Sequence, residues 1–265
     1  MESESKIDGA GALRIDGMAP LLTVAGRDVL FAHWPVDDEA LAERLPAPLV
    51  PATFDGTGWV SVLALENDGV GLGSRVRRSA VRGGFPQLNL RTYVTPRGGG
   101  DDVGVYFLSL DTGRWAAAVA ARRSFGLPFH HASMRLTRHD GRLTFRSQRR
   151  GVDTPAVFQA RYRPTGAAFR VEPGSLEAFC VEQFRYYVPA AEDHRAVSGA
   201  NGRDGGVRVG RVTHDPWSLQ PVTATIRTNT LFEAAGLPTP TAEPTTHYSP
   251  GFEMGVERLE TRRGE

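Results

Sequence analysis

The stretch Leu88-Asn89-Leu90-Arg91-Thr92-Tyr93-Val94 decides the fold class, because its side chains alternate in character along the chain. Successive side chains of a β-strand point to opposite faces of the sheet. One face would carry Leu88, Leu90, Thr92 and Val94, and the other Asn89, Arg91 and Tyr93. The polar face either lines a barrel interior, where Arg91 can hold a carboxylate, or faces solvent, and the spacing leaves both open.

Strand patterns dominate the rest of the chain, and helical patterns are few and short. Strands are predicted near residues 29–34, 59–65, 103–110, 207–212 and 222–226, after Pro250, and in a hairpin at 133–147 around Asp140-Gly141. Helices are predicted at residues 38–45 behind an Asp37 cap, at 115–125, from 176 to about 187 behind a Ser175 cap, and near Leu231. Together they predict an α+β fold built on an antiparallel sheet or barrel.

Residues 1–19 are predicted to form a disordered leader and residues 20–265 a single domain. A chain that is 40% hydrophobic can bury one sizeable core, and its net charge of +1 gives no footprint for nucleic acid. No apolar stretch is long enough to span a membrane and no signal peptide is evident, so a cytoplasmic protein is expected. The single cysteine, Cys180, suits a reducing compartment. The sequence does not fix the oligomeric state, and a homo-oligomer is compatible with it.

Lysine is almost absent, since only Lys6 among the 31 Lys and Arg residues is a lysine. It lies in the expected leader, so the folded body carries no amine side chain. A desolvated lysine amine is the group that forms a Schiff base with a carbonyl substrate. A general preference for arginine explains most of the missing lysines, but it would not remove a lysine that catalysis required.

Other motifs carry little chemistry. The glycine-rich residues 69–73 lack the third glycine of a phosphate-binding loop and are expected to form a flexible loop. His130-His131 and His214-Asp215 lack the spacing of metal ligands on one helix, so neither a metal nor another cofactor is predicted. Cys180 falls on the apolar face of its predicted helix and is expected to be a buried small hydrophobe.

Several segments taken in order resemble the YqjF-like proteins, a bacterial family of unknown function. They are Phe85-Pro86-Gln87-Leu88-Asn89-Leu90-Arg91-Thr92-Tyr93-Val94, Phe125-Gly126-Leu127-Pro128-Phe129-His130, His214-Asp215-Pro216-Trp217-Ser218-Leu219-Gln220-Pro221 and His247-Tyr248-Ser249-Pro250-Gly251. The resemblance covers the chain from about residue 21 onward. It implies the fold of the acetoacetate-decarboxylase-like superfamily, a closed or nearly closed antiparallel β-barrel with flanking helices and a central pocket.

The resemblance also identifies a departure from the decarboxylase. Gly126-Leu127-Pro128-Phe129-His130 looks similar to the Gly-x-Pro-Lys-Lys segment that carries the Schiff-base lysine, with both lysines replaced. Decarboxylation through an amine is therefore not expected, while His130 remains as a polar group for the pocket.

These observations favour a protein that acts on a small organic acid or carbonyl compound by non-covalent acid–base chemistry of the lyase, cyclase or isomerase type. Arg91 would hold an anion or polarise a carbonyl, with Glu182 as its resting partner. The groups that would move protons are Tyr93, His130, Glu182 and His214. A ligand-binding or regulatory module without turnover is the alternative, and a metal-assisted hydrolase is a third possibility.

We predict that the protein forms no Schiff base with keto acids, because the folded body has no lysine amine. Incubation with acetoacetate and borohydride should leave the intact mass unchanged. A stoichiometric, substrate-dependent adduct that survives removal of residues 1–19 would contradict this prediction.

Overall fold

The computed structural model describes residues 20–73, 84–98, 102–115, 119, 122, 125–190 and 206–262. The expected leader, residues 1–19, lies outside this part, as does most of the polar loop around residues 201–206. The described chain is mostly β-sheet with a few short helices, as the strand patterns predicted. No helix in this part is long and apolar enough to cross a membrane.

The strands are β1 (Leu22–Val36), β2 (Leu49–Pro51), β3 (Thr53–Phe54), β4 (Thr57–Leu72), β5 (Phe85–Pro96), β6 (Gly104–Thr112), β7 (Phe129–His139), β8 (Arg142–Arg149), β9 (Val157–Pro164), β10 (Phe169–Arg170), β11 (Arg185–Pro189), β12 (Val207–His214), β13 (Ser218–Asn229), β14 (Thr245–Val256) and β15 (Glu260–Arg262). The helices with defined bounds are α1 (Asp38–Ala42), α3 (Leu176–Val181) and α4 (Leu231–Ala234).

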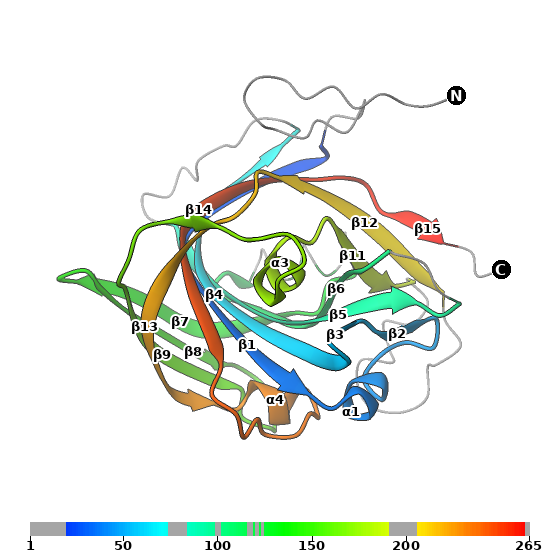
Figure 1. Ribbon diagram of the computed structural model, residues 1–265, viewed down its shortest axis with the longest axis horizontal. Helices are drawn as coiled ribbons and strands as arrows, with labels where there is room; N and C mark the ends of the chain where they lie inside the picture. The colour runs from blue at the N-terminus through cyan, green and yellow to red at the C-terminus, as the bar shows by residue number, and fades with distance from the viewer. Residues whose placement is uncertain are drawn as a thin grey trace.

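The strand pairings close the sheet on itself twice. Strands β6, β11, β12, β14, β1, β4 and β5 pair in that order, and β5 pairs back with β6, which makes a seven-strand ring. A second path of pairings runs β13-β9-β8-β7-β6-β5-β4-β1-β14 and returns to β13, which makes a nine-strand ring. Figure 1 shows the first ring around α3, with β7, β8, β9 and β13 beside it. The structure therefore confirms a closed barrel.

The barrel is mixed rather than antiparallel, which corrects the expectation from the sequence. Strand β6 runs parallel to both β7 and β11, and the other pairings are antiparallel. Parallel neighbours cannot be joined by a tight turn and need a longer crossover. The chain between β6 and β7 supplies it, and its described residues Trp115, Val119, Arg122 and Phe125 are helical, in agreement with the predicted helix.

Strands shared by the two rings bury both of their faces. In β1, Leu30, Ala32 and Trp34 pack in the core of the nine-strand ring. The alternate residues Val29 and Phe31 pack in the core of the seven-strand ring. Two faces buried in this way explain why residues 29–34 of β1 are apolar apart from His33.

The helix predicted from residue 176 to about 187 is shorter than expected and lies in a different place. Its Ser175 cap is confirmed, because the Ser175 hydroxyl accepts a hydrogen bond from the Ala178 amide. The helix ends at Val181, and Arg185, Tyr186 and their neighbours form β11 instead. Aromatic and β-branched residues in the run 184–188 favour a strand. Helix α3 sits inside the seven-strand ring (Figure 1), so flanking helices describe only part of this fold.

Local turn and cap chemistry agrees with the prediction elsewhere. The Asp37 carboxylate accepts hydrogen bonds from the Glu39 and Ala40 amides at the start of α1. In the hairpin between β7 and β8, Asp140 and Gly141 have φ of 48° and 70°, the left-handed conformations that a two-residue turn of this type requires.

Two boundaries were predicted wrongly. The glycine-rich residues 69–72 form the end of β4 and pair with β1, so they are not a flexible loop. The last long strand begins at Thr245 rather than after Pro250, and Pro250 lies within β14. In both cases pairing with β1 decides the conformation, and single-strand patterns do not contain that information.

We predict that Phe232→Ala destabilises the fold strongly. Phe232 in α4 is fully buried and packs edge-on against Trp34, with ring centroids 5.4 Å apart. Truncating such a ring should lower the free energy of unfolding by about 3–5 kcal/mol in urea denaturation. Phe169, which is 37% exposed, is the matched control, and Phe169→Ala should cost about 1 kcal/mol or less. Equal costs for the two variants would contradict the assignment of α4 to the core.

Candidate functional site

A row of polar side chains crosses three neighbouring strands inside the seven-strand ring. His33 in β1 is in register with Ser61 in β4, and Ser61 is in register with Arg91 in β5. Tyr93 lies two residues beyond Arg91 on the same face, and its ring packs 4.9 Å from the ring of Phe179 in α3. The polar face predicted from the alternation of β5 therefore faces the barrel interior and is not a solvent-exposed sheet face.

Short hydrogen bonds connect this row to α3. The His33 Nδ1 and Ser61 Oγ atoms are 2.6 Å apart, and Ser61 Oγ is 2.6 Å from the Tyr93 hydroxyl. The Tyr93 hydroxyl donates to the Cys180 carbonyl oxygen at 2.7 Å, and Arg91 Nη2 donates to the same oxygen at 2.7 Å. Two donors from one strand thus converge on a single oxygen position.

The environment of Arg91 is unusual for a buried charge. Arg91 is 8% exposed. Its positive charge does not pair with any carboxylate in the described part of the chain. It is held by a carbonyl at the carboxyl end of α3, where helix carbonyls lack intrahelical partners and carry partial negative charge. Arg91 Nε is buried without a partner among the described residues. An arginine in this setting is well placed to bind an anionic oxygen by donating hydrogen bonds to it.

Burial keeps the neighbouring groups uncharged. Burial, with the nearby Arg91 charge, holds the pKa of His33 well below its ordinary value, so His33 is neutral at pH 7. Burial also raises the pKa of Tyr93, so its hydroxyl stays protonated and donates. The row therefore combines one fixed positive charge with neutral groups that can pass hydrogen bonds between them.

A second histidine lies beside this row. His247 in β14 is in register with Phe31, two residues from His33 on the same face, and it is near enough to lower the pKa of His33. Its Nε2 atom is 3.9 Å from Glu177 Oε1 of α3. Burial lowers the pKa of His247 despite the Glu177 carboxylate. The buried atoms His33 Nε2 and His247 Nδ1 have no partner among the described residues.

Glu182 and His214 lie close together at the carboxyl end of α3, but neither contacts Arg91. His214 Nδ1 is 3.9 Å from Glu182 Oε2, and Glu182 Oε1 accepts a hydrogen bond of 2.7 Å from the Trp217 amide. Glu182 as the resting partner of Arg91 is therefore wrong. The Glu182 carboxylate connects the end of α3 to the segment that follows β12 through this hydrogen bond.

His130 lies in a separate polar cluster. On β7 it is in register with Asp111 of β6, on the face that packs into the nine-strand ring. Asp111 is 1% exposed and accepts a 2.9 Å hydrogen bond from Arg149 Nε, while Arg149 Nη2 donates to Ser109. Burial, followed by the charges of Arg149 and Arg122, lowers the pKa of His130 to about 4. The structure therefore does not bring His130 to Arg91 and Tyr93.

Sequence reasoning missed His33, Ser61 and His247 as members of the site. His33 follows Val29 and Phe31 at a spacing of two residues, which places all three on one face of the strand. Ser61 is the one hydroxyl residue in the run 60–65. His247 stands in the segment that carried the family resemblance. Each signal is weak alone, because the meeting of the three residues depends on pairing between strands far apart in the sequence.

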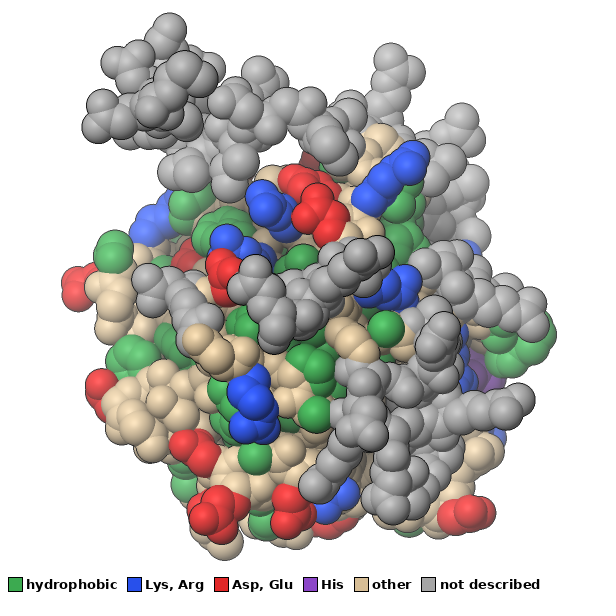
Figure 2. Space-filling view, turned by 90° about the vertical axis from the view of Figure 1, so that its right-hand side faces the viewer, with side chains coloured by type: hydrophobic (Ala, Val, Ile, Leu, Met, Phe, Trp, Pro, Cys, Tyr) green, Lys and Arg blue, Asp and Glu red, His purple; other side chains and the backbone are tan. Residues whose placement is uncertain are grey.

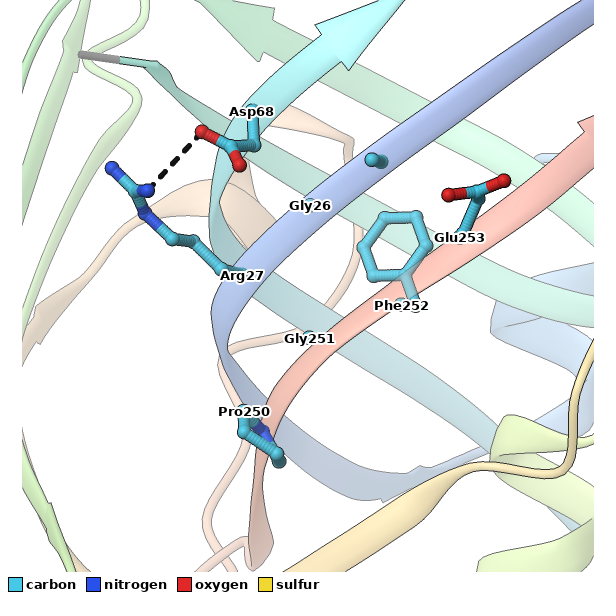
Figure 3. Close-up of a pocket in the computed structure, with 8 residues that line it drawn as sticks. Gly26, Arg27, Asp68, Pro250, Gly251, Phe252 and Glu253 are labelled. Atoms are coloured by element: carbon cyan, nitrogen blue, oxygen red, sulfur yellow. Dashed lines mark ion pairs between the residues drawn. The ribbon is translucent and has the colours of Figure 1, made fainter. Parts of the chain in front are cut away.

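An open groove of about 770 Å³ lies elsewhere, beside an irregularity in β1 (Figure 3). Gly26 and Gly251 contribute no side chains to its wall, and an Arg27–Asp68 ion pair of 3.2 Å lies at its edge. The row of polar side chains that includes Arg91 and Tyr93 does not line this groove. The groove is therefore not the central pocket that the resemblance implied. Acidic and basic side chains are interspersed on the face shown in Figure 2, in keeping with the small net charge.

Among the described residues, no group of three or more His, Cys, Asp or Glu side chains is arranged to hold a metal ion. The donors around Arg91 instead suit an organic oxygen. Arginine and tyrosine donate hydrogen bonds, whereas a metal site requires deprotonated or neutral acceptors.

Comparison with known sequences connects the chain to one family. The sequence pattern of DUF2071, described as an uncharacterised conserved protein family, matches residues 24–253. The uncharacterised protein YqjF of Bacillus subtilis strain 168 is 35% identical over 225 residues, which is 84% of each chain. The family match includes all or most of every strand of the seven-strand ring.

Comparison with solved structures identifies the fold. The enduracididine biosynthesis enzyme MppR complexed with pyruvate superposes with a TM-score of 0.61 at 10% identity, covering 96% of this chain and 94% of that one. Acetoacetate decarboxylase from Legionella pneumophila gives a TM-score of 0.58 at 12% identity, covering 99% and 98%. At such identities the likeness shows a shared acetoacetate-decarboxylase-like fold.

We predict that His33 makes stability depend on pH. The unfolded chain binds a proton at His33 below about pH 6.5, while the folded protein keeps this residue neutral. The stability contribution is therefore complete above pH 6.5, and the free energy of unfolding should fall by up to about 1.4 kcal/mol per pH unit below it. Urea denaturation between pH 7.5 and 5.5 measures this slope.

The His33→Gln variant removes the titrating group and should show a shallower slope. His139, whose side chain is 90% exposed, is the matched control, and His139→Gln should leave the slope unchanged. The same slope in wild type and His33→Gln would show that the folded protein can protonate His33.

Proposed function

The chain belongs to the DUF2071 family, and from that premise we propose that it binds a small carboxylate or carbonyl compound inside the seven-strand ring. The observation that carries the proposal is the convergence of Arg91 Nη2 and the Tyr93 hydroxyl on one buried oxygen position, each at 2.7 Å. A ligand oxygen at this position would receive two hydrogen bonds, one of them from a permanent charge.

A related fold supports this class of ligand. MppR, whose structure resembles that of this chain, is complexed with pyruvate, a small keto acid. The buried Arg91 Nε offers a further donor for the second oxygen of a carboxylate. The guanidinium presents its donors in a planar fork, which suits a carboxylate better than the single point charge of an ammonium group.

The row also supports acid–base chemistry without a covalent intermediate. Tyr93 is protonated and can donate to a carbonyl oxygen as negative charge develops there. Ser61 and His33 lie behind it at 2.6 Å steps and can exchange hydrogen bonds with the phenol as its charge changes. Steps of the lyase, cyclase or isomerase type need groups of this kind and no amine.

One observation favours the alternative of a ligand-binding module without turnover. Four residues of the site are 0% exposed, namely His33, Ser61, Tyr93 and Cys180. The groups that would move protons are therefore tightly enclosed by protein atoms. The two functions differ in a direct measurement. Exchange of the methyl protons of pyruvate in D2O, followed by NMR, indicates acid–base chemistry, whereas binding without exchange indicates the module.

We predict that Arg91→Lys weakens carboxylate binding by about ten-fold or more. The change keeps the positive charge but loses the fork that can serve two oxygens. Calorimetry with pyruvate as the first probe measures the affinity, with thermal unfolding as the check that the variant is folded. Arg149→Lys is the matched control, because it alters another buried arginine in the other ring, and it should leave the affinity unchanged. Unchanged affinity in folded Arg91→Lys would assign Arg91 a structural role only.

A further inference from the structure

The oxygen position formed by Arg91 and Tyr93 is filled by the protein itself. The Cys180 carbonyl oxygen of α3 accepts from both donors at 2.7 Å. A second oxygen cannot occupy the same point, because the two hydrogen-bonded hydrogens are already directed at the first one. Any ligand that uses both donors in this position must therefore displace the carbonyl.

The carbonyl is a weaker partner for Arg91 than a carboxylate. A carbonyl at the end of a helix carries only partial negative charge. A carboxylate carries a full charge and has two oxygens, so it can also accept from the unpartnered Arg91 Nε. Exchanging the carbonyl for a carboxylate thus increases the interaction at the buried guanidinium.

Helix α3 depends on its docking contacts. It has six residues, a length that does not form a stable helix alone in water. Phe179 packs against the rings of Tyr93 and Phe54, at 4.9 and 5.8 Å between centroids. Beyond the helix, Glu182 is bound to the Trp217 amide. Loss of a few contacts can therefore release α3 without opening the strand pairings.

We infer that α3 is a built-in competitor for the ligand site, so that a bound carboxylate and the docked carboxyl end of α3 exclude each other. This inference rests on the proposed function and adds its regulation. The apparent affinity then equals the intrinsic affinity multiplied by the fraction of molecules in which α3 is released. Changes that weaken α3 docking should strengthen binding, whereas a merely structural helix would have the opposite effect.

The single cysteine provides a direct measure of α3 docking. Cys180 is 0% exposed, and burial raises the pKa of its thiol to about 12, so the docked helix protects it from alkylation. Removing one donor to the Cys180 carbonyl in Tyr93→Phe should raise the rate of iodoacetamide labelling about five-fold, measured by intact mass. Tyr106→Phe, which alters a partly buried tyrosine away from α3, should leave the rate unchanged.

The measurement of affinity uses a variant of a residue that holds α3 in place but does not contact the Cys180 carbonyl oxygen. Phe179→Ala should tighten pyruvate binding several-fold in calorimetry, because it raises the released fraction. Phe145→Ala is the matched control, since Phe145 is a buried ring on β8 in the core of the nine-strand ring, away from α3. It should leave the affinity unchanged. Saturating pyruvate should also speed Cys180 labelling in the wild-type protein.

The outcomes separate the inference from the proposed function. Unchanged labelling in folded Tyr93→Phe overturns the inference whatever binds. Pyruvate binding that is unchanged or weaker in Phe179→Ala, or that slows Cys180 labelling, overturns the inference and leaves the proposed function standing. No pyruvate binding to wild type or Phe179→Ala contradicts both the keto-acid ligand and the competition. Faster labelling in Tyr93→Phe, tighter binding in Phe179→Ala and labelling accelerated by pyruvate together support the inference.

Discussion

The rest of the interior depends on the hydrogen bond between the buried guanidinium of Arg91 and the Cys180 carbonyl oxygen of α3. A permanent charge inside a protein is costly unless it is paired or hydrogen-bonded. Here the carboxyl end of α3 supplies the partner, which places the helix inside the ring rather than on its surface. The same charge disfavours a proton on His33. The interior is therefore arranged for one positive charge, neutral donors and a negative or partly negative oxygen.

The two rings separate the polar residues into distinct environments. Strands shared by both rings direct alternate side chains into different cores, so a shift of one residue would exchange the two sets. Irregular pairings fix this register. In β1 the pairing with β4 shifts around Asp28, which has φ of 53° and accepts hydrogen bonds of 2.7 Å from Tyr248 and Arg138. In β6 a shift opposite Leu90 and Arg91 places Phe107 across from Arg91 and Ser109 across from Leu90.

The parts of the fold that depend on local chemistry could be predicted from the sequence. Alternation in β5 identified both the strand and its two faces, and the Asp37 cap and the Asp140-Gly141 turn marked their elements. Long-range pairing could not be predicted. The parallel neighbours of β6, the end of α3 at Val181 and the meeting of His33 with Ser61 all depend on strands distant in the chain. For the same reason Arg91 and Tyr93 were placed together correctly, since one strand carries both, while His130, Glu182 and His214 were not.

The absence of lysine from residues 20–265 limits the chemistry open to this barrel. An amine can lose its proton and attack a carbonyl carbon, but a guanidinium stays protonated and can only hold and polarise an oxygen. The two positions that resemble the decarboxylase lysines carry Phe129 and His130, and His130 lies near Arg149 rather than in the row with Arg91. In the proposed function, hydrogen bonds from Arg91 and Tyr93 stabilise the charge that develops on a ligand oxygen. Under the competition proposed for α3, the selectivity of this barrel depends on how well a ligand oxygen replaces the Cys180 main-chain carbonyl at Arg91 and Tyr93.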